Sequence, residues 1–168
     1  MSIKAAILTI STRGSQGKQE DTSGQAIQEI LQKIDTDIVD YLIIPDDREQ
    51  IVAQLKRLVE DVKAELILTT GGTGLSPTDV TPEATLAVID RRVPGLEEAM
   101  RMTGFKKTPH ALLSRAVAGI HKNALIINLP GSPKGVRENL EAILSAIPHG
   151  VKILKGGQVD DKEHDFQK

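Results

Sequence analysis

The sequence predicts an α/β protein, a three-layer α/β/α sandwich with a mostly parallel sheet and one antiparallel hairpin near an edge. Short, almost unbroken apolar runs such as Ile3–Ile10 are typical of strands that are buried on both faces. Amphipathic helix patterns alternate with these runs, as they do in parallel sheets that are covered by helices. One short connection, His121-Lys122-Asn123, joins two strand-like runs directly and predicts the hairpin.

The first strand, Ile3–Ile10, ends at Ser11-Thr12-Arg13-Gly14, and the polar segment up to Glu20 is a predicted loop. Thr22 or Ser23 can then cap a helix. The apolar side chains of this helix follow the i, i+3, i+4, i+7 spacing of a helix packed on one face, and they are Ile27, Ile30, Leu31 and Ile34.

The second strand is predicted at residues 38–44. Asp46 or Asp47 can cap the helix that follows. Glu49 and Gln50 stand three residues further on, as in a capping box. The apolar stripe of this helix consists of Ile51, Leu55, Leu58, Val59 and Val62.

The third strand, at residues 66–69, leads into a glycine-rich loop. The helix after the loop is expected to begin with Thr81 as its N-cap and Pro82 at its first position. It should end before Val93-Pro94, because a residue that precedes proline disfavours helical dihedral angles. A second short helix can follow at residues 95–100.

The last third of the chain predicts the two hairpin strands, at residues 115–120 and Ala124–Leu129. A final helix then begins, with Ser132 as its N-cap and Pro133 as its first residue. Proline and glycine near residue 148 interrupt this helix.

The length and composition of the chain predict one domain at residues 1–157 and a polar C-terminal tail at residues 158–168. The formal net charge of −2 argues against nucleic acid as a partner. No apolar run approaches the ~20 residues of a membrane span, and the absence of cysteine excludes a thiolate metal site. We expect a cytoplasmic protein that binds a small anionic ligand, with no membrane partner.

The centre of the predicted site is the sequence Thr69-Thr70-Gly71-Gly72-Thr73-Gly74, which lies between a strand and a helix. Glycines let backbone N–H groups approach a ligand, and hydroxyl groups and a helix N-terminus suit an anion. A phosphate group is therefore the expected ligand, and a plain strand-to-helix turn is the alternative. Polar or glycine-containing stretches follow four strands, where α/β sheets bind ligands; they are Ser11-Thr12-Arg13, Pro45-Asp46, residues 69–79 and residues 128–132.

This loop differs from the common phosphate-binding motifs. No Gly-Lys-Ser/Thr sequence follows it, and the segment from Gly72 to Pro77 lacks the third glycine of the dinucleotide fingerprint. The groups that remain for binding a phosphate are the glycines and hydroxyls of this loop, the carboxylates of Asp46 and Asp79, and the cations of Arg13, Arg115 and Lys134. Carboxylates beside phosphates usually act through Mg²⁺, which predicts a magnesium site.

Several motifs resemble the MogA/MoaB family of molybdenum cofactor biosynthesis proteins. They are Thr70-Gly71-Gly72-Thr73-Gly74, Asp79-Val80-Thr81-Pro82-Glu83-Ala84-Thr85, Leu113-Ser114-Arg115 and Asn128-Leu129-Pro130-Gly131-Ser132-Pro133, and the likeness spans about residues 3–155. The resemblance implies the same three-layer fold in a homotrimer or hexamer. It also implies that ATP and molybdopterin react to give adenylyl-molybdopterin and pyrophosphate, with other molybdenum cofactor biosynthesis proteins, including the metal-insertion enzyme, as partners.

By resemblance, Asp46 and Asp79 match the essential carboxylates of the family, and we predict that they are catalytic and bind Mg²⁺. A helix cap is the alternative role for Asp46, and an idle loop acid is the alternative for Asp79. The terminal phosphate of molybdopterin is ionised at neutral pH, so the reaction needs a metal and positioning more than a general base. The predicted substrate-binding residues are Ser11, Thr70, Gly71, Gly72, Thr73, Gly74, Ser114, Arg115, Asn128, Pro130, Gly131, Ser132 and Lys134, and a solvated surface position is equally compatible with Lys134.

Two positions depart from the usual family pattern. Thr78 stands where many members carry arginine, and Thr12 stands where many carry aspartate. A non-catalytic MoaB-type molybdopterin-binding or scaffold protein on the same fold is the alternative function, because a fold does not determine a function. The retained pair Asp46 and Asp79 favours the enzyme, and the sequence leaves the choice between molybdenum and tungsten open.

Overall fold

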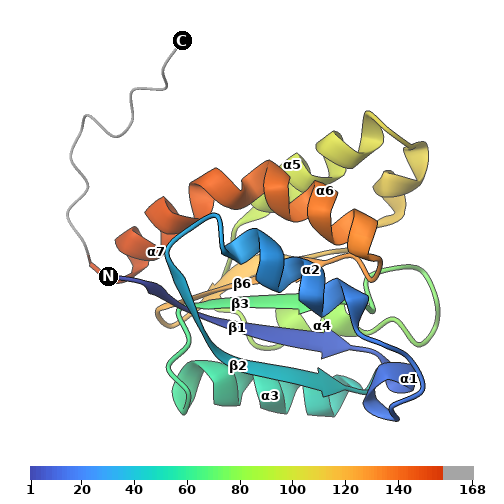
Figure 1. Cartoon of the computed structure of the whole chain (residues 1–168), viewed down its shortest axis with the longest axis horizontal. Helices are drawn as coiled ribbons and strands as arrows, with labels where there is room; N and C mark the ends of the chain where they lie inside the picture. The colour runs from blue at the N-terminus through green and yellow to red at the C-terminus, as the bar shows by residue number, and fades with distance from the viewer. Residues whose placement is uncertain (157–168) are drawn as a thin grey trace.

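The computed structural model describes residues 1–156, which form a six-stranded sheet with helices on both faces (Figure 1). The strand order is β2-β1-β3-β6-β5-β4. The parallel strands are β1 (Ile3–Ile10), β2 (Thr36–Ile44), β3 (Leu66–Thr70) and β6 (Ala124–Leu129). At one edge, β5 (Ala118–His121) runs antiparallel to β6, and the short β4 (Arg91–Arg92) runs antiparallel to β5. The predicted fold class is therefore confirmed, while the predicted tail at residues 158–168 lies outside the described residues.

Helices form the two outer layers of the sandwich. One face of the sheet packs against α2 (Thr22–Leu31), α5 (Pro94–Phe105), α6 (Pro133–Ile143) and α7 (Ile147–Leu154). The other face packs against α3 (Arg48–Glu60) and α4 (Thr81–Leu86). Shorter helical segments also occur along the chain; they are α1 (Thr12–Ser15), η1 (Pro109–Leu113) and η2 (Leu144–Ala146). No helix in the described part is both long and apolar enough to cross a membrane.

β1 lies between β2 and β3, and from Ala5 onward it is buried on both faces, as its apolar run predicts. Ala5 and Ile7 pack in one hydrophobic cluster, and Ala6 and Leu8 pack in the other. Successive side chains of a strand point to opposite faces, so a strand between two helical layers needs apolar residues at every position. The C-terminal end of β1 lies between those of β2 and β3, at the edge of the sheet where the predicted ligand loops also lie.

One helix cap differs from the predicted ones, and a second one settles a choice that the sequence left open. Asp21, and neither Thr22 nor Ser23, caps α2 by accepting a hydrogen bond from the Gly24 N–H at 2.9 Å. The cap of α3 is Asp47, which leaves Asp46 outside the helix.

Thr81 was predicted as the N-cap of α4, but it lies inside the helix and Val80 holds the cap position. The Thr81 hydroxyl instead donates to the carbonyl oxygen of Gly71 at 2.9 Å. Because Thr81 lies inside the helix and not at its cap position, its hydroxyl serves the preceding loop, and the first turn of α4 has no side-chain cap.

Other differences concern short elements. The sequence 12–15, predicted as loop, forms the single turn α1, and the two-residue strand β4 was not predicted. The strand predicted at residues 115–120 begins only at Ala118, and the helix predicted at residues 95–100 extends over Pro94–Phe105. Of these elements, α1 and β4 carry too few residues for a hydrophobic period to indicate them.

Asn128 is a fully buried polar residue in β6. Its amide nitrogen donates to the hydroxyls of Thr69 at 3.0 Å and Thr85 at 2.9 Å, and its carbonyl oxygen accepts from the Val117 backbone N–H at 3.1 Å. These bonds join β3, α4 and the segment before β5 behind the site. Asn128, which was predicted to contact substrate, is therefore placed in the interior with its amide engaged by the protein.

Replacing Asn128 with alanine leaves these buried groups without a partner, so we expect the free energy of unfolding to fall by about 3 kcal/mol. Asn139→Ala is the control, because the half-buried Asn139 amide donates to Gly135 within α6. Urea unfolding followed by circular dichroism measures both variants. A loss for Asn128→Ala no larger than for the control contradicts this interior role.

A charged cluster joins the end of α3 to the β5–β6 hairpin. Glu60 Oε1 lies 2.8 Å from Lys122 Nζ and 3.3 Å from His121 Nε2, and His121 Nδ1 lies 3.2 Å from Asp90 Oδ2. The hydrogen bond from Lys122, followed by that from His121, lowers the pKa of Glu60 below its ordinary value. The ionised form of Glu60 is thus favoured in the folded protein.

This lowered pKa predicts how stability depends on pH. A carboxylate with a depressed pKa stabilises the fold above its unfolded pKa, and the contribution disappears as the pH falls through the folded pKa. The difference in unfolding free energy between wild type and Glu60→Gln should therefore be constant above about pH 5 and should vanish in more acidic solution. Urea unfolding between neutral and acidic pH tests this, and a Lys122→Met background should shrink the difference. A difference that grows on acidification contradicts the prediction.

Candidate functional site

The predicted ligand stretches meet at one edge of the sheet, because the parallel strands that precede them end there. Thr70, the last residue of β3, is in register with Thr9 of β1 and Leu129 of β6. The Gly71 N–H donates to the carbonyl oxygen of Leu129 at 3.2 Å, so the glycine loop begins directly beside the turn that follows β6.

The glycine loop is packed so tightly that side chains cannot enter it. Gly71 and Gly72 have φ angles of 97° and 67°, which L side chains rarely adopt. A Cβ at Gly71 would lie 2.3 Å from the Ile10 carbonyl oxygen, and one at Gly72 would lie 2.3 Å from Thr81 Oγ1. The loop therefore requires glycine at both positions.

Two carboxylates flank the glycine loop, which we call the cradle (residues 71–74). A Cβ built at Gly72 would lie 3.4 Å from Asp46 Oδ1, and one built at Gly74 would lie 2.8 Å from Asp79 Oδ2. Asp46 follows β2 and Asp79 precedes α4, so they are far apart in the sequence. The fold brings one carboxylate to each of these two glycines of the cradle.

Asp46 is oriented by Thr12. Asp46 Oδ2 accepts hydrogen bonds from the Thr12 backbone N–H at 3.0 Å and from its hydroxyl at 2.8 Å. The helix-cap role considered for Asp46 belongs to Asp47 instead, whose side chain accepts from the Gln50 N–H. Thr12 thus holds the carboxylate beside the cradle, and Asp46 Oδ1 is left on the side of Gly72.

Asp79 lies at the end of an exposed loop. Its Oδ2 accepts from the Ser76 N–H at 3.0 Å, and its own N–H donates to the Ser76 carbonyl at 2.9 Å. Thr78 is exposed and its hydroxyl lies 3.0 Å from that of Ser76. A pair of hydroxyl groups therefore occupies this exposed part of the loop.

Two cavities lie at the site. The central cavity has a volume of about 480 Å³ and is lined by Thr9, Ile10, Ser11, Gly14, Gln19, Glu20, Asp21, Thr22, Ser23, Asp46, Thr70, Gly71, Gly72, Gly131, Ser132 and Pro133. The side cavity, of about 340 Å³, is lined by Thr73, Gly74, Gly104, Thr108, His110, Ala111, Leu113, Ser114, Pro130, Ser132, Lys134, Gly135, Glu138 and Asn139. The two cavities are neighbours, because Ser132 lines both of them. The other predicted site residues that line a cavity are divided between the two.

The wall between the two cavities is the turn at residues 130–132, and hydroxyl groups hold it. The Thr70 hydroxyl donates to the Pro130 carbonyl at 2.6 Å, and the Ser23 hydroxyl donates to the Gly131 carbonyl at 2.6 Å. Thr70 therefore acts as an anchor of the loop. Ser23, which the sequence indicated only as a possible helix cap, performs the same task from α2.

The N-termini of α2 and α6 both line the central cavity through their first residues, among them Thr22 and Ser132. Helix N-termini carry a partial positive charge and unpaired N–H groups, which favour anions. The cavity therefore combines two helix N-termini with the carboxylates of Glu20, Asp21 and Asp46, so a phosphate bound there would need a cation beside it.

Asp21 is a residue of the central cavity that the sequence analysis missed. Its Oδ2 accepts from the Thr9 hydroxyl at 2.6 Å and from the Tyr41 hydroxyl, while Oδ1 caps α2. Burial, together with the hydrogen bond to this carboxylate, raises the pKa of Tyr41 well above its usual range. The sequence feature that indicates Asp21 is an aspartate, a preferred N-cap residue, directly before the first residue of the helix.

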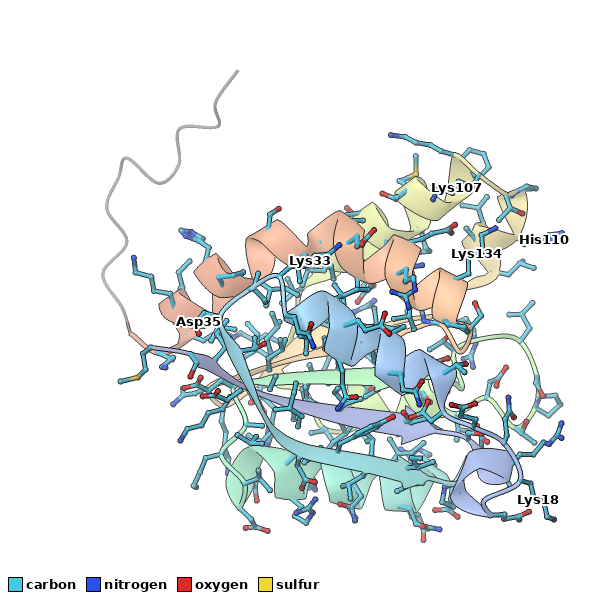
Figure 2. All side chains as sticks on the ribbon, in the orientation of Figure 1. Lys18, Lys33, Asp35, Lys107, His110 and Lys134 are labelled. Carbon is cyan, nitrogen blue, oxygen red and sulfur yellow. The ribbon has the colours of Figure 1, made fainter. Side chains whose placement is uncertain are left out.

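Arg115 and Lys134 were predicted as substrate-binding cations. The Arg115 guanidinium donates to the carbonyl oxygens of Gly74 and Asp79, each at 2.8 Å, and pairs with Glu83. Lys134 is 84% exposed and lies 3.9 Å from Glu138. It shares one side of the molecule with His110, which also lines the side cavity (Figure 2). Arg115 is thus engaged in the loop, whereas Lys134 stays accessible at the rim.

Asp46 and Asp79 are the two residues of the site that the sequence predicted as metal ligands. Among residues 1–156, no group of three or more histidine, cysteine, aspartate or glutamate side chains could hold a metal. Magnesium takes one or two carboxylates and completes its shell with phosphate oxygens and water. The two carboxylates beside a bare glycine surface could therefore hold Mg²⁺ once a phosphate is present.

Comparisons with known proteins agree with this geometry. The family model described as "Probable molybdopterin binding domain" matches residues 6–149. The chain is 43% identical to the molybdopterin adenylyltransferase of Helicobacter pylori strain J99, covering 98% of this chain and 95% of that protein. It is 38% identical to the Escherichia coli K12 enzyme of that name, covering 94% and 88%. The crystal structure of the molybdopterin biosynthesis enzyme MoaB from Thermus thermophilus has a TM-score of 0.88 at 46% identity, covering 94% of this chain and 99% of that one. The chain therefore belongs to the MogA/MoaB family of molybdenum cofactor biosynthesis proteins.

Proposed function

We propose that this protein is a molybdopterin adenylyltransferase that uses ATP and Mg²⁺. The supporting relatives carry this name at 38–43% identity over nearly the whole chain. The observation that carries the proposal is the glycine cradle with one carboxylate at each side. Asp46 stands beside Gly72 and Asp79 beside Gly74, in the place where α/β sheets bind ligands.

The proposed reaction is a transfer of the AMP group. An oxygen of the terminal phosphate of molybdopterin attacks the α-phosphorus of ATP, and a new P–O bond forms as the bond to the β-phosphate breaks. The products are adenylyl-molybdopterin and pyrophosphate. Because the attacking phosphate is already ionised near neutral pH, no side chain has to remove a proton, and catalysis depends on positioning and on charge stabilisation.

The side chains and backbone of the site have complementary tasks in this proposal. The bare cradle lets phosphate oxygens approach backbone N–H groups, and the N-termini of α2 and α6 favour their negative charge. Two adjacent cavities that meet at Ser132 offer room for two substrates. Ser114 and Thr73 line the side cavity and would donate hydrogen bonds there. When bound, Mg²⁺ would neutralise charge on the transferred phosphoryl group, held by Asp46 and Asp79.

The proposal also includes the setting in which the enzyme works. By family resemblance it would assemble as a homotrimer or hexamer in the cytoplasm and pass its product to the enzyme that inserts the metal. Adenylylated pterin is an activated phosphate, so a reaction that consumes it must follow in the same pathway.

Incubation with molybdopterin, ATP and Mg²⁺ tests the proposal, with adenylylated pterin and pyrophosphate detected by mass spectrometry and a coupled assay. We expect both products from the wild type, and a rate about 100-fold lower from Asp79→Asn, because a missing charge contact in a transition state costs several kcal/mol. Molybdopterin binding to Asp79→Asn, measured by fluorescence titration, should remain.

The control is Asp61→Asn, at the C-terminal end of α3 and outside the residues that line either cavity. It should keep the wild-type rate. Unchanged turnover of Asp79→Asn would reject the metal assignment. Tight molybdopterin binding by the wild type with no adenylylated product would instead support the non-catalytic scaffold alternative.

A methyl group in the cradle should block the phosphate site. In Gly72→Ala the new Cβ would lie 2.3 Å from Thr81 Oγ1 at a φ of 67°, so the loop must move. We expect ATP affinity, measured by isothermal titration calorimetry, to fall by about tenfold or more. Gly95→Ala is the matched control, since nothing lies within 4 Å of a Cβ there. Equal ATP affinity of the two variants would show that the cradle is not the phosphate site.

A further inference from the structure

We propose that Glu97 and Arg101 of α5 are positioning residues for Asp79, although neither lines a cavity of the site. They hold the segment at residues 114–118 in the place from which Arg115 fastens the loop that carries Asp79. The catalytic consequence rests on the proposed function, whereas the mechanical link rests on the contacts alone.

The first step concerns the loop at residues 74–79. Within the part of the chain that the structure describes, the hydrogen bonds that join this loop to the rest of the protein come from Arg115. Its Nε donates to the Gly74 carbonyl and its Nη2 donates to the Asp79 carbonyl, each at 2.8 Å. The other hydrogen bonds of the loop connect Ser76, Thr78 and Asp79 to one another. The position of Asp79 therefore depends on the position of Arg115.

Little buried surface holds the loop in addition. Leu75 is 63% exposed, and residues 75–78 are all exposed. A segment with few buried contacts opens locally at low free energy unless its polar anchors hold it. The two carbonyl contacts of Arg115, at the two ends of the loop, are those anchors.

The second step concerns the segment that carries Arg115. On the α5 side, Arg101 Nη1 donates to the carbonyls of Ser114 at 3.2 Å and Ala116 at 3.1 Å, and Glu97 Oε1 accepts from the Ala118 N–H at 3.0 Å. On the other side, the Arg115 N–H donates to the Thr73 carbonyl at 2.9 Å. The backbone groups of Ser114, Ala116 and Ala118 thus face α5. Arg115, which lies between the first two, faces the cradle, because successive residues of an extended chain point to opposite sides.

The third step concerns the buried charge that keeps this arrangement in place. Glu97 is 2% exposed, and its Oε2 lies 2.6 Å from Arg92 and 3.2 Å from Arg101. A buried carboxylate is stable only when it is paired and hydrogen-bonded, and removing one partner is costly. The planar guanidinium of Arg101 can donate to Glu97 and to two carbonyls at once, which a lysine ammonium does with less directional control.

Hydrogen exchange of the ligand-free protein tests the link, with the amides of Ser76 and Asp79 as probes and a readout by NMR or mass spectrometry. In Arg101→Met, these amides should exchange about tenfold faster, because their loop has lost its fixed anchor. Arg101→Lys should restore part of the protection. Arg57→Met is the matched control, because Arg57 forms a comparable pair with Asp40 at 2.6 Å on the opposite face of the sheet.

Activity supplies a second readout. With Arg101→Met, the Mg²⁺ concentration that gives half-maximal turnover should rise severalfold, whereas with Arg57→Met it should stay close to the wild-type value. Should Arg101→Met fail to fold, Glu97→Gln replaces it, since glutamine can still accept from the Ala118 N–H.

Loop exchange that matches the wild type in the folded variants overturns the positioning role. Acceleration in Arg57→Met equal to that in Arg101→Met overturns it as well, because the effect would then be general destabilisation. Faster loop exchange in a protein whose wild type forms no adenylylated pterin supports the mechanical link and rejects the proposed function.

Discussion

The close approach of backbones at Gly71 and Gly72 is the constraint on which the site depends. At these residues the end of β3 passes within contact distance of the end of β1 and the start of α4, so that no Cβ fits. The left-handed φ angles turn the chain sharply, and Thr81 fastens the turn by donating to the Gly71 carbonyl. This compact crossing brings Asp46, from the end of β2, beside the cradle. With any larger residue, the loop or its neighbours Ile10 and Thr81 would have to shift.

Polar residues around the cradle divide into those that face the cavities and those that hold the loops. Thr70 and Ser23 fasten the turn after β6, and Thr12 orients Asp46. Arg115 fastens the loop that carries Asp79. These anchors use hydroxyl and guanidinium groups of the same kind that would bind a phosphate. A site that must place charges to within a fraction of an ångström needs such supporting contacts as much as it needs the groups that touch substrate.

Much of the fold could be predicted from local patterns. Apolar runs located β1, β3 and β6, and the Ser132-Pro133 pair located the start of α6, because burial on both faces and helix capping leave marks in adjacent residues. Predictions failed where two adjacent groups competed for one role. Asp21 caps α2 in place of Thr22 or Ser23, and the Thr81 hydroxyl serves the glycine loop. Neighbouring side chains of similar chemistry cannot be ranked without the contacts that each one makes elsewhere.

The sequence by itself determined the order of strands and helices, the glycine loop and the family motifs with Asp46 and Asp79. All of these depend on residue type and on spacing along the chain. Only the tertiary structure decided which polar groups remain available to a ligand. Asn128 and Arg115 carry suitable chemistry, yet Asn128 is buried among three partners and Arg115 is committed to the loop. The reason is that a hydrogen-bonding group can satisfy only a few partners, and in this site those partners lie tens of residues away in the sequence.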